Sequence, residues 1–120
     1  MNKTIIICCP GDCFSGKFIK CLTHLIKHLN NIGFKVYFCS AYSRNIYEVR
    51  NKCMLGSPIK GPNQQPFNGR KYDYILWIDN DMVFTTTDFD LLYKEDIDVI
   101  SGLYIMANDK DFAAVEYWDE

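Results

Sequence analysis

Two aspartates, Asp79 and Asp81, carry the clearest chemical signal in the sequence. They flank Asn80 directly after the apolar stretch YILWI, so we expect them to leave the core where a strand ends. Two carboxylates this close repel each other unless a cation or hydrogen bonds compensate. Oxygen ligands suit a hard cation such as Mg2+ or Mn2+, which keeps open positions for water and a diphosphate. The same acids are also common as turn or capping residues at strand ends.

A second stretch, PGDCFSGKF at residues 10–18, partly matches the phosphate-binding loop of nucleotide triphosphatases. Gly11, Gly16 and Lys17 fit the pattern G-x-x-x-x-G-K-[ST], but Phe18 stands where a hydroxyl residue should bind Mg2+. A degenerate triphosphatase that uses GDCFSGK is therefore one alternative. The favoured interpretation is a turn from a strand into a helix, with Lys17 on the helix surface.

Histidines and cysteines give weaker metal signals. His24 and His28 are four residues apart, as a metal pair on a helix can be, but without a nearby acid a polar helix edge is favoured. The six cysteines contain no C-x-x-C spacing, and Cys8 and Cys9 are adjacent in an apolar run. This pattern favours reduced structural thiols over disulfides or zinc.

The composition is typical of a packed globular chain. Its 120 residues suit one domain, 48% of them are hydrophobic, and the formal net charge is -2, which gives no reason to expect nucleic acid as a partner. The opening run TIIICC is shorter than a signal-peptide core, and no run approaches the roughly 20 apolar residues of a membrane span. We therefore predict a soluble, cytoplasmic protein without a membrane span.

Hydrophobic periodicity predicts strands that alternate with helices. Ser15 is a suitable N-cap and Gly33 a suitable stop for the first helix, and Asn45 and Glu48 have the spacing of a capping pair for the second. The stretch 56–70 holds three of the four prolines and is predicted as a loop. The predicted strands span 3–9, 34–41, 72–81 and 97–106, the predicted helices 16–32, 43–55 and 85–96, and a further strand is considered over 112–120.

This alternation predicts a three-layer α/β/α domain with a mostly parallel sheet. In such sheets ligands bind outside the carboxyl ends of the strands. The chemistry is therefore expected at the segments CPGD, CSAYS and IDND, which end or follow predicted strands, and at GLY in the last of them.

With these segments in order, the chain resembles the nucleotide-sugar-binding half of glycosyltransferases with the GT-A fold. The resemblance is greatest to a compact group common in viral and bacterial sequences. It depends on four segments, whose order and spacing match across nearly all of the chain: an early CPGDCFSG turn, a helix carrying RN, the strand YDYILWIDND and the strand DIDVISGLY.

The resemblance implies roles for matching residues. Asp81 would be the principal protein ligand of a Mn2+ or Mg2+ ion that bridges the donor diphosphate, and Asp79 would lie near the donor ribose or the metal. Pro10 and Gly11 would line the nucleotide pocket. The pair Arg50 and Asn51 in EVRNKCM would help to hold the donor, although both can also be solvated helix residues.

It also implies a transferase that passes a sugar from a nucleotide-diphosphate sugar to an acceptor hydroxyl. GT-A enzymes are usually longer than this chain, so the 120 residues are expected to be a truncated, donor-binding domain that is incomplete at its C-terminus and inactive alone. No catalytic base is assigned. A non-catalytic nucleotide or nucleotide-sugar binding module is the other alternative, and uncovered apolar surface makes a homo-oligomer plausible.

Overall fold

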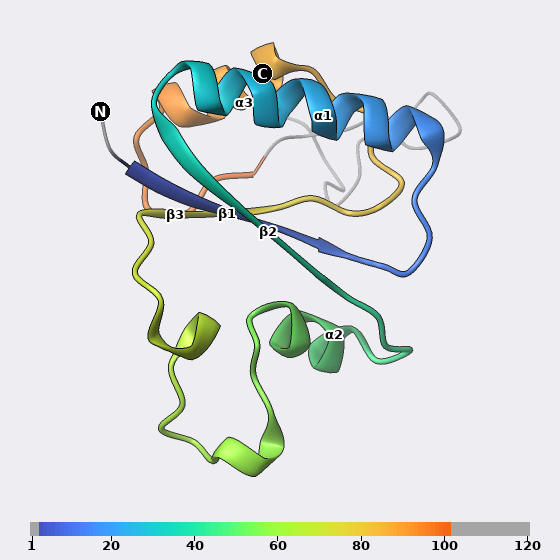
Figure 1. Ribbon diagram of the computed structural model, residues 1–120, viewed down its shortest axis with the longest axis vertical. Coiled ribbons are helices and arrows are strands. Elements are labelled where there is room, and N and C mark those ends of the chain that lie inside the picture. Colours follow the sequence, from blue (N-terminus) through green and yellow to red (C-terminus); the bar gives the residue numbers. More distant parts are fainter. Residues whose placement is uncertain (1–2, 102–120) are drawn as a thin grey trace, which may run out of the picture. The chain divides into compact units, whose positions relative to one another are not determined.

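A computed structural model of the chain describes residues 3–101. The chain divides into two compact units, Met1–Thr86 and Thr87–Glu120. All strands of the described part belong to the first unit, which also holds the first two helices (Figure 1). None of the helices in residues 3–101 has the length and hydrophobicity needed to cross a membrane.

The first unit is built on a parallel sheet of three strands in the order β2-β1-β3. The strands are β1 (Lys3–Pro10), β2 (Phe34–Ala41) and β3 (Tyr74–Trp77). The five central side chains of β1, from Ile5 to Cys9, are almost completely buried, as expected of a strand covered on both faces. The prediction of an α/β fold with a parallel sheet is confirmed for this part of the chain.

Helix α1 (Gly16–Asn31) covers one face of the sheet and α2 (Ile46–Cys53) the other (Figure 1). Ser15 caps α1 as predicted, because its hydroxyl accepts a hydrogen bond from the Phe18 N–H at 3.1 Å. The helix buries an apolar stripe at helical spacing. Its buried residues are Phe18, Leu22, Leu25 and Leu29.

The α2 side has its own small core, in which Ile6 and Cys8 of β1 pack with Cys53 and Phe67. Asn45 caps α2 as predicted, with its side-chain oxygen accepting from the Tyr47 N–H at 2.9 Å. Glu48, the expected partner in the capping pair, instead forms an ion pair with Lys52 at 3.0 Å. The helix is shorter than the predicted 43–55, because the chain leaves helical geometry at Leu55, where φ is +61°.

The predicted loop after α2 contains two short 3-10 turns, Pro58–Lys60 and Pro66–Gly69, and is anchored at two points. Gln64 bonds through its side chain to the backbone N–H and C=O of Ser57. Phe67 is buried, and its N–H donates to the Met54 C=O at 2.7 Å. Among the described residues of the loop, Phe67 alone is buried, and it anchors the loop on the α2 side of the sheet.

Two predicted strands differ from the structure. The third was expected over 72–81 but β3 spans only Tyr74–Trp77, because it pairs with β1 only from Ile5 to Cys8. The predicted fourth strand is wrong over 97–101, where the chain has bends and Ile97 and Val99 are exposed. No described segment pairs with 97–101, and a strand needs such a partner. The remainder of that strand, and the one considered over 112–120, lie outside the described residues.

Helix α3 (Thr86–Lys94) agrees with the short helix predicted over 85–96. Its one buried side chain is Phe89, whose ring lies 5.7 Å from that of Tyr93, one helical turn later.

Candidate functional site

The strand order places a topological switch point between β1 and β3. The chain passes from β1 to β2 on one side of the central strand and then to β3 on the other side. In open parallel sheets, ligands bind at the carboxyl ends of the strands where the direction of winding reverses in this way. The loops that follow β1 and β3 flank this point, and they contain Asp12, Asp79 and Asp81. We refer to these three carboxylates and their two loops as the acid edge.

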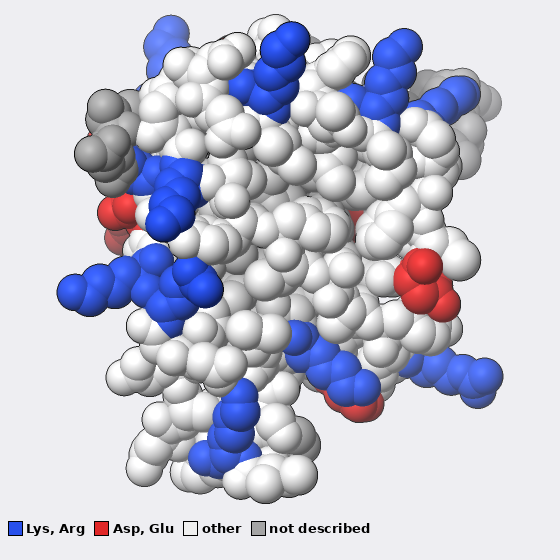
Figure 2. Space-filling view, in the orientation of Figure 1, with Lys and Arg blue, Asp and Glu red and all other residues white. Residues whose placement is uncertain are grey.

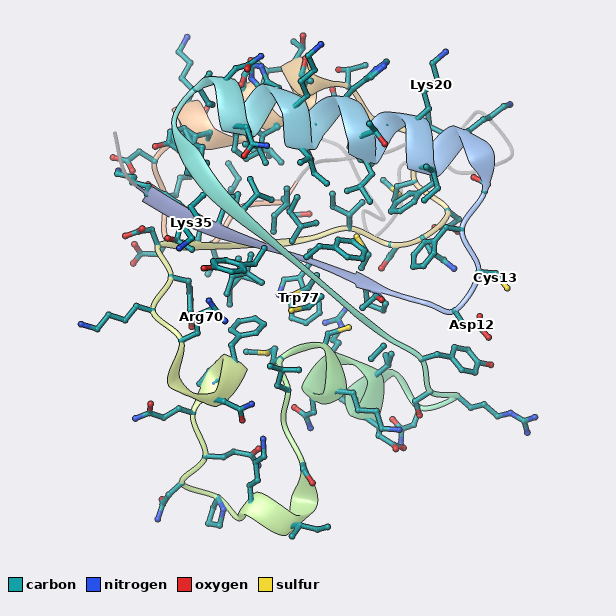
Figure 3. All side chains as sticks on the ribbon, viewed as in Figure 1. Asp12, Cys13, Lys20, Lys35, Arg70 and Trp77 are labelled. Carbon is teal, nitrogen blue, oxygen red and sulfur yellow. The ribbon has the colours of Figure 1, made fainter. Side chains whose placement is uncertain are left out.

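An amide side chain joins the two loops of the acid edge. Asn80 Nδ2 donates a hydrogen bond of 2.9 Å to the backbone oxygen of Cys13, in the turn between β1 and α1. The same turn is joined to β2, since the Gly11 N–H donates to the Ala41 C=O at 2.9 Å. Figure 3 shows Asp12 and Cys13 at the tip of this turn, where β1 leads into α1. The turn therefore has fixed contacts with the ends of both neighbouring strands.

Gly11 is required by this contact. Its φ is +143°, and a Cβ added at this position would lie 2.6 Å from Asn80 Nδ2 and 3.0 Å from its Cγ. Both the backbone conformation and the close approach favour glycine. Pro10, the other residue expected to line a nucleotide pocket, is half-buried at the end of β1 and pairs with Ala41. The structure brings Gly11 directly against the residue between the two predicted metal ligands.

Asp79 and Asp81 are both exposed, so they can present oxygens to a ligand. Within residues 3–101 neither carboxylate forms an ion pair with a lysine or arginine. Beneath them lies a neutral thiol: burial raises the pKa of Cys9 to about 12, with contributions from Cys53 and from the negative charge of Asp79. Asp79 and Asp81 therefore carry negative charge that no lysine or arginine of residues 3–101 pairs with, and the buried Cys9 thiol near Asp79 is uncharged.

These residues fit a hard divalent cation held mainly by oxygen. In the part of the chain that the structure describes, no three His, Cys, Asp or Glu side chains are grouped as a complete metal cage, and His24 and His28 belong to no such group. Mg2+ usually needs only one or two protein carboxylates and takes its other ligands from water and substrate phosphates. Two exposed carboxylates at a switch point, without an ion pair in the described part of the chain, are compatible with that arrangement.

Arg50 and Asn51 lie in different surroundings. The Arg50 guanidinium carbon is 5.9 Å from the ring centroid of Trp77, two residues before Asp79, so α2 brings this cation to the end of β3. Asn51 instead borders a separate hollow of about 630 Å3 between α2 and the loop after it. Its backbone oxygen accepts from Gly56 N at 2.7 Å. Among the described contacts, only the arginine of this predicted pair approaches β3.

The phosphate-loop alternative lacks the hydroxyl that would bind Mg2+, because the residue at that position is Phe18 in the core. Phe18 is fully buried, stacked on Phe14 at a centroid distance of 5.4 Å and edge-on to Phe84 at 6.1 Å. Lys17 is exposed on the first turn of α1, as expected of a surface lysine. The residue at the Ser/Thr position of the pattern is therefore a packing residue under the turn.

The chain was compared with family models, with curated proteins and with solved structures. No family model, curated protein or solved structure matches the chain.

Two residues of the site were not identified from the sequence. In the sequence Asn80 is the spacer between two acids, and Trp77 belongs to an apolar strand. The signal for Asn80 was a glycine directly after the first strand, since such a glycine often indicates a close approach by another segment. Trp77 carries no such signal, because its exposure depends on where β3 ends.

Proposed function

We propose that the chain is the donor-binding part of a metal-dependent glycosyltransferase, which binds a nucleotide-diphosphate sugar at the acid edge. One observation carries this proposal: two exposed carboxylates, which form no ion pair within residues 3–101, follow β3 at the switch point, and the Asn80 side chain hydrogen-bonds their loop to the turn after β1. Two acids on a loop that is fixed beside a strand-to-helix turn suit a diphosphate bridged by a cation. The sequence resemblance to GT-A glycosyltransferases supports the same function.

The residues of the site have distinct tasks in this proposal. Asp81 holds the Mn2+ or Mg2+ ion, and Asp79 holds the ion or the donor ribose. A bound ion of this kind would supply the positive charge that stabilises the departing nucleoside diphosphate. Gly11 gives the turn its close path past Asn80, and Arg50 offers a further cation near the end of β3. No residue is assigned as the base that activates an acceptor hydroxyl.

The test is calorimetric titration of UDP, GDP and ATP into the 120-residue chain, with and without Mn2+. We expect diphosphate binding that needs the metal, and loss of that binding, by about tenfold or more, in Asp81→Ala. Asp98→Ala is the matched control, because it removes one exposed carboxylate outside the acid edge. Equal binding with and without Mn2+, or equal loss in both variants, would contradict the proposal.

A non-catalytic binding module would give the same titrations. Turnover separates the two functions: release of nucleoside diphosphate from a bound sugar donor, monitored with and without added acceptor sugars, requires the transferase. Metal-dependent binding without such release across the donors tested would favour the binding module.

A further inference from the structure

Two cations of the first unit lie over the ring of one tyrosine of β2. The Arg70 guanidinium carbon lies 4.1 Å from the ring centroid of Tyr37, and the Lys35 ammonium nitrogen lies 5.4 Å from the same centroid. Lys71 follows Arg70 and is exposed. Figure 3 shows Lys35 on β2 and Arg70 before β3, on segments far apart in the sequence. We call Lys35, Tyr37, Arg70 and Lys71 the basic cluster.

The cations of the cluster have no acidic ion-pair partner among the described residues. Within residues 3–101, no carboxylate pairs with Lys35, Arg70 or Lys71. The nearby Asp73 uses one carboxylate oxygen to accept from the Thr4 N–H at 2.7 Å. In Figure 2, drawn in the same orientation as Figure 3, blue Lys and Arg atoms gather in adjacent groups where Figure 3 labels Lys35 and Arg70. Like charges gathered this way attract an anion.

A hollow of about 570 Å3 opens beside the cluster at the amino end of the sheet. Arg70 and Lys71 border it, together with Gln65, Gly69 and Asp73 among other residues. This volume is in the range of small-molecule sites. Arg70 therefore contributes both to the hollow and to the stack on Tyr37.

The segment that carries Arg70 is held in place before any ligand binds. Phe67 anchors it in the α2-side core, and the Arg70 N–H donates to the Phe67 C=O at 3.1 Å. Tyr37 is also affected by the cations: a hydrogen bond with Lys35, and then the charge of Arg70, lower the pKa of its hydroxyl. A hydroxyl with a lowered pKa is a stronger hydrogen-bond donor. Around Tyr37, two cations of the cluster, Lys35 and Arg70, thus combine with a phenolic donor on prearranged segments.

We propose that the basic cluster is a binding site for a phosphate group, separate from the acid edge, with Arg70, Lys35 and the Tyr37 hydroxyl as its ligands. A planar guanidinium with a neighbouring ammonium recognises a phosphate dianion better than a carboxylate, because the dianion offsets more of the cluster's charge. The phosphate is either free or part of a monoester whose organic group enters the hollow.

The probe is inorganic phosphate, titrated at constant ionic strength into the isotope-labelled 120-residue chain and followed by NMR. Saturable shifts are expected at Lys35, Tyr37 and Arg70, with weaker shifts for acetate. Arg70→Ala should weaken phosphate binding about tenfold or more, since a charge-assisted hydrogen bond is lost. Arg44→Ala, which removes another exposed arginine, should change it less than twofold.

Tyr37→Phe provides a second test that keeps the ring under both cations. It should weaken phosphate binding several-fold while the chain keeps its unfolding midpoint. Asp81→Ala should leave the titration unchanged, which separates this site from the acid edge. Non-saturable shifts, or equal weakening by Arg70→Ala and Arg44→Ala, would overturn the proposal. Phenyl phosphate distinguishes the sources: tighter binding than inorganic phosphate indicates a monoester, and equal binding indicates free phosphate.

Discussion

The acid edge and the basic cluster belong to the same three-strand sheet but are built by opposite means. At the acid edge, uncharged contacts fix the path of the loops: a glycine, an amide hydrogen bond and the stacking of Phe14 on the buried ring of Phe18. The carboxylates project from this frame and are not part of it. In the basic cluster, the charged groups themselves pack, because Arg70 and Lys35 lie on the Tyr37 ring. At the acid edge, the groups that hold the loops and the groups that carry charge are different residues. In the basic cluster, the same residues do both.

The largest expected effect on the free energy of unfolding comes from Phe18, the buried ring under the turn after β1. Phe18→Thr would restore the hydroxyl of the phosphate-loop pattern, but it removes a fully buried ring. We expect a loss of about 3–5 kcal/mol in the free energy of unfolding, measured in urea, with no gain in ATP hydrolysis. Phe38→Thr on β2 is the control, since that ring is 44% exposed and should cost much less. A stable, ATP-hydrolysing Phe18→Thr chain would favour the triphosphatase.

Gly11 should produce the next largest effect. Gly11→Ala forces a side chain into a positive φ and against Asn80, so we expect a loss of about 2–3 kcal/mol in unfolding free energy. Gly16→Ala is a matched control, because no atom lies within 4 Å of the added Cβ at that position. Urea unfolding of both variants measures the difference.

A double-mutant cycle locates the cause of that loss. Asn80→Ala removes the amide atoms nearest the added methyl group, so Gly11→Ala should cost about 1 kcal/mol less in the Asn80→Ala background. If the losses in unfolding free energy of the two single variants add up to that of the double variant, the positive φ of Gly11 alone, and not its contact with Asn80, requires glycine at this position.

The buried thiols predict a loss of stability in alkaline solution. Burial raises the pKa of Cys9 from its ordinary value of 9.0 to about 12 in the folded chain. The unfolded chain therefore releases this proton first, so the stabilising contribution is complete below pH 9 and is lost as the pH rises towards 12. At pH 10 we expect Cys9 to lower the free energy of unfolding by about 1.4 kcal/mol relative to its value well below pH 9. The urea midpoints of the parent chain and of Cys9→Val should differ in their slopes between pH 8 and 10, and parallel slopes would contradict the prediction.

Removing one charged side chain from each region should have the smallest effects on the free energy of unfolding. The two losses should differ, because only the cation of the basic cluster packs on another side chain. Arg70→Ala is expected to cost about 0.5–1 kcal/mol, because it removes an exposed cation from an aromatic ring. Asp81→Ala should stay within about 0.5 kcal/mol of the parent, since this exposed side chain has no ion-pair partner in the described part. Thermal unfolding of both variants provides the measurement. A larger loss in Asp81→Ala than in Arg70→Ala would break the distinction drawn between frame and charge.

The sequence predicts the elements that depend on local patterns. The apolar run of β1, the Ser15 and Asn45 caps, and the stripe of α1 follow from periodicity and capping rules, and the structure agrees. The limits of β3 do not follow in this way, because they depend on how far β1 offers a pairing edge. The stretch 97–101 has the composition of a strand, but a strand also needs a partner, and composition does not supply one.

The candidate site was predictable only in part for the same reason. The acids at the end of β3 and the turn after β1 can be located from the sequence, because parallel strands end at one edge. The contact between Gly11 and Asn80 joins positions that are 69 residues apart. The contact between Arg70 and Tyr37 joins the segment before β3 to β2. Such contacts depend on strand order, which no short pattern specifies.

Trp77 gives the acid edge an optical signal of its own. Its ring is 39% exposed, lies two residues before Asp79 and faces the Arg50 guanidinium, whose charge affects indole emission. With Trp118 replaced by phenylalanine, Trp77 would be the single tryptophan of the chain. Its fluorescence would then respond when a ligand displaces Arg50 or changes the charge at the end of β3, so occupancy of this edge can be followed in solution without any attached label.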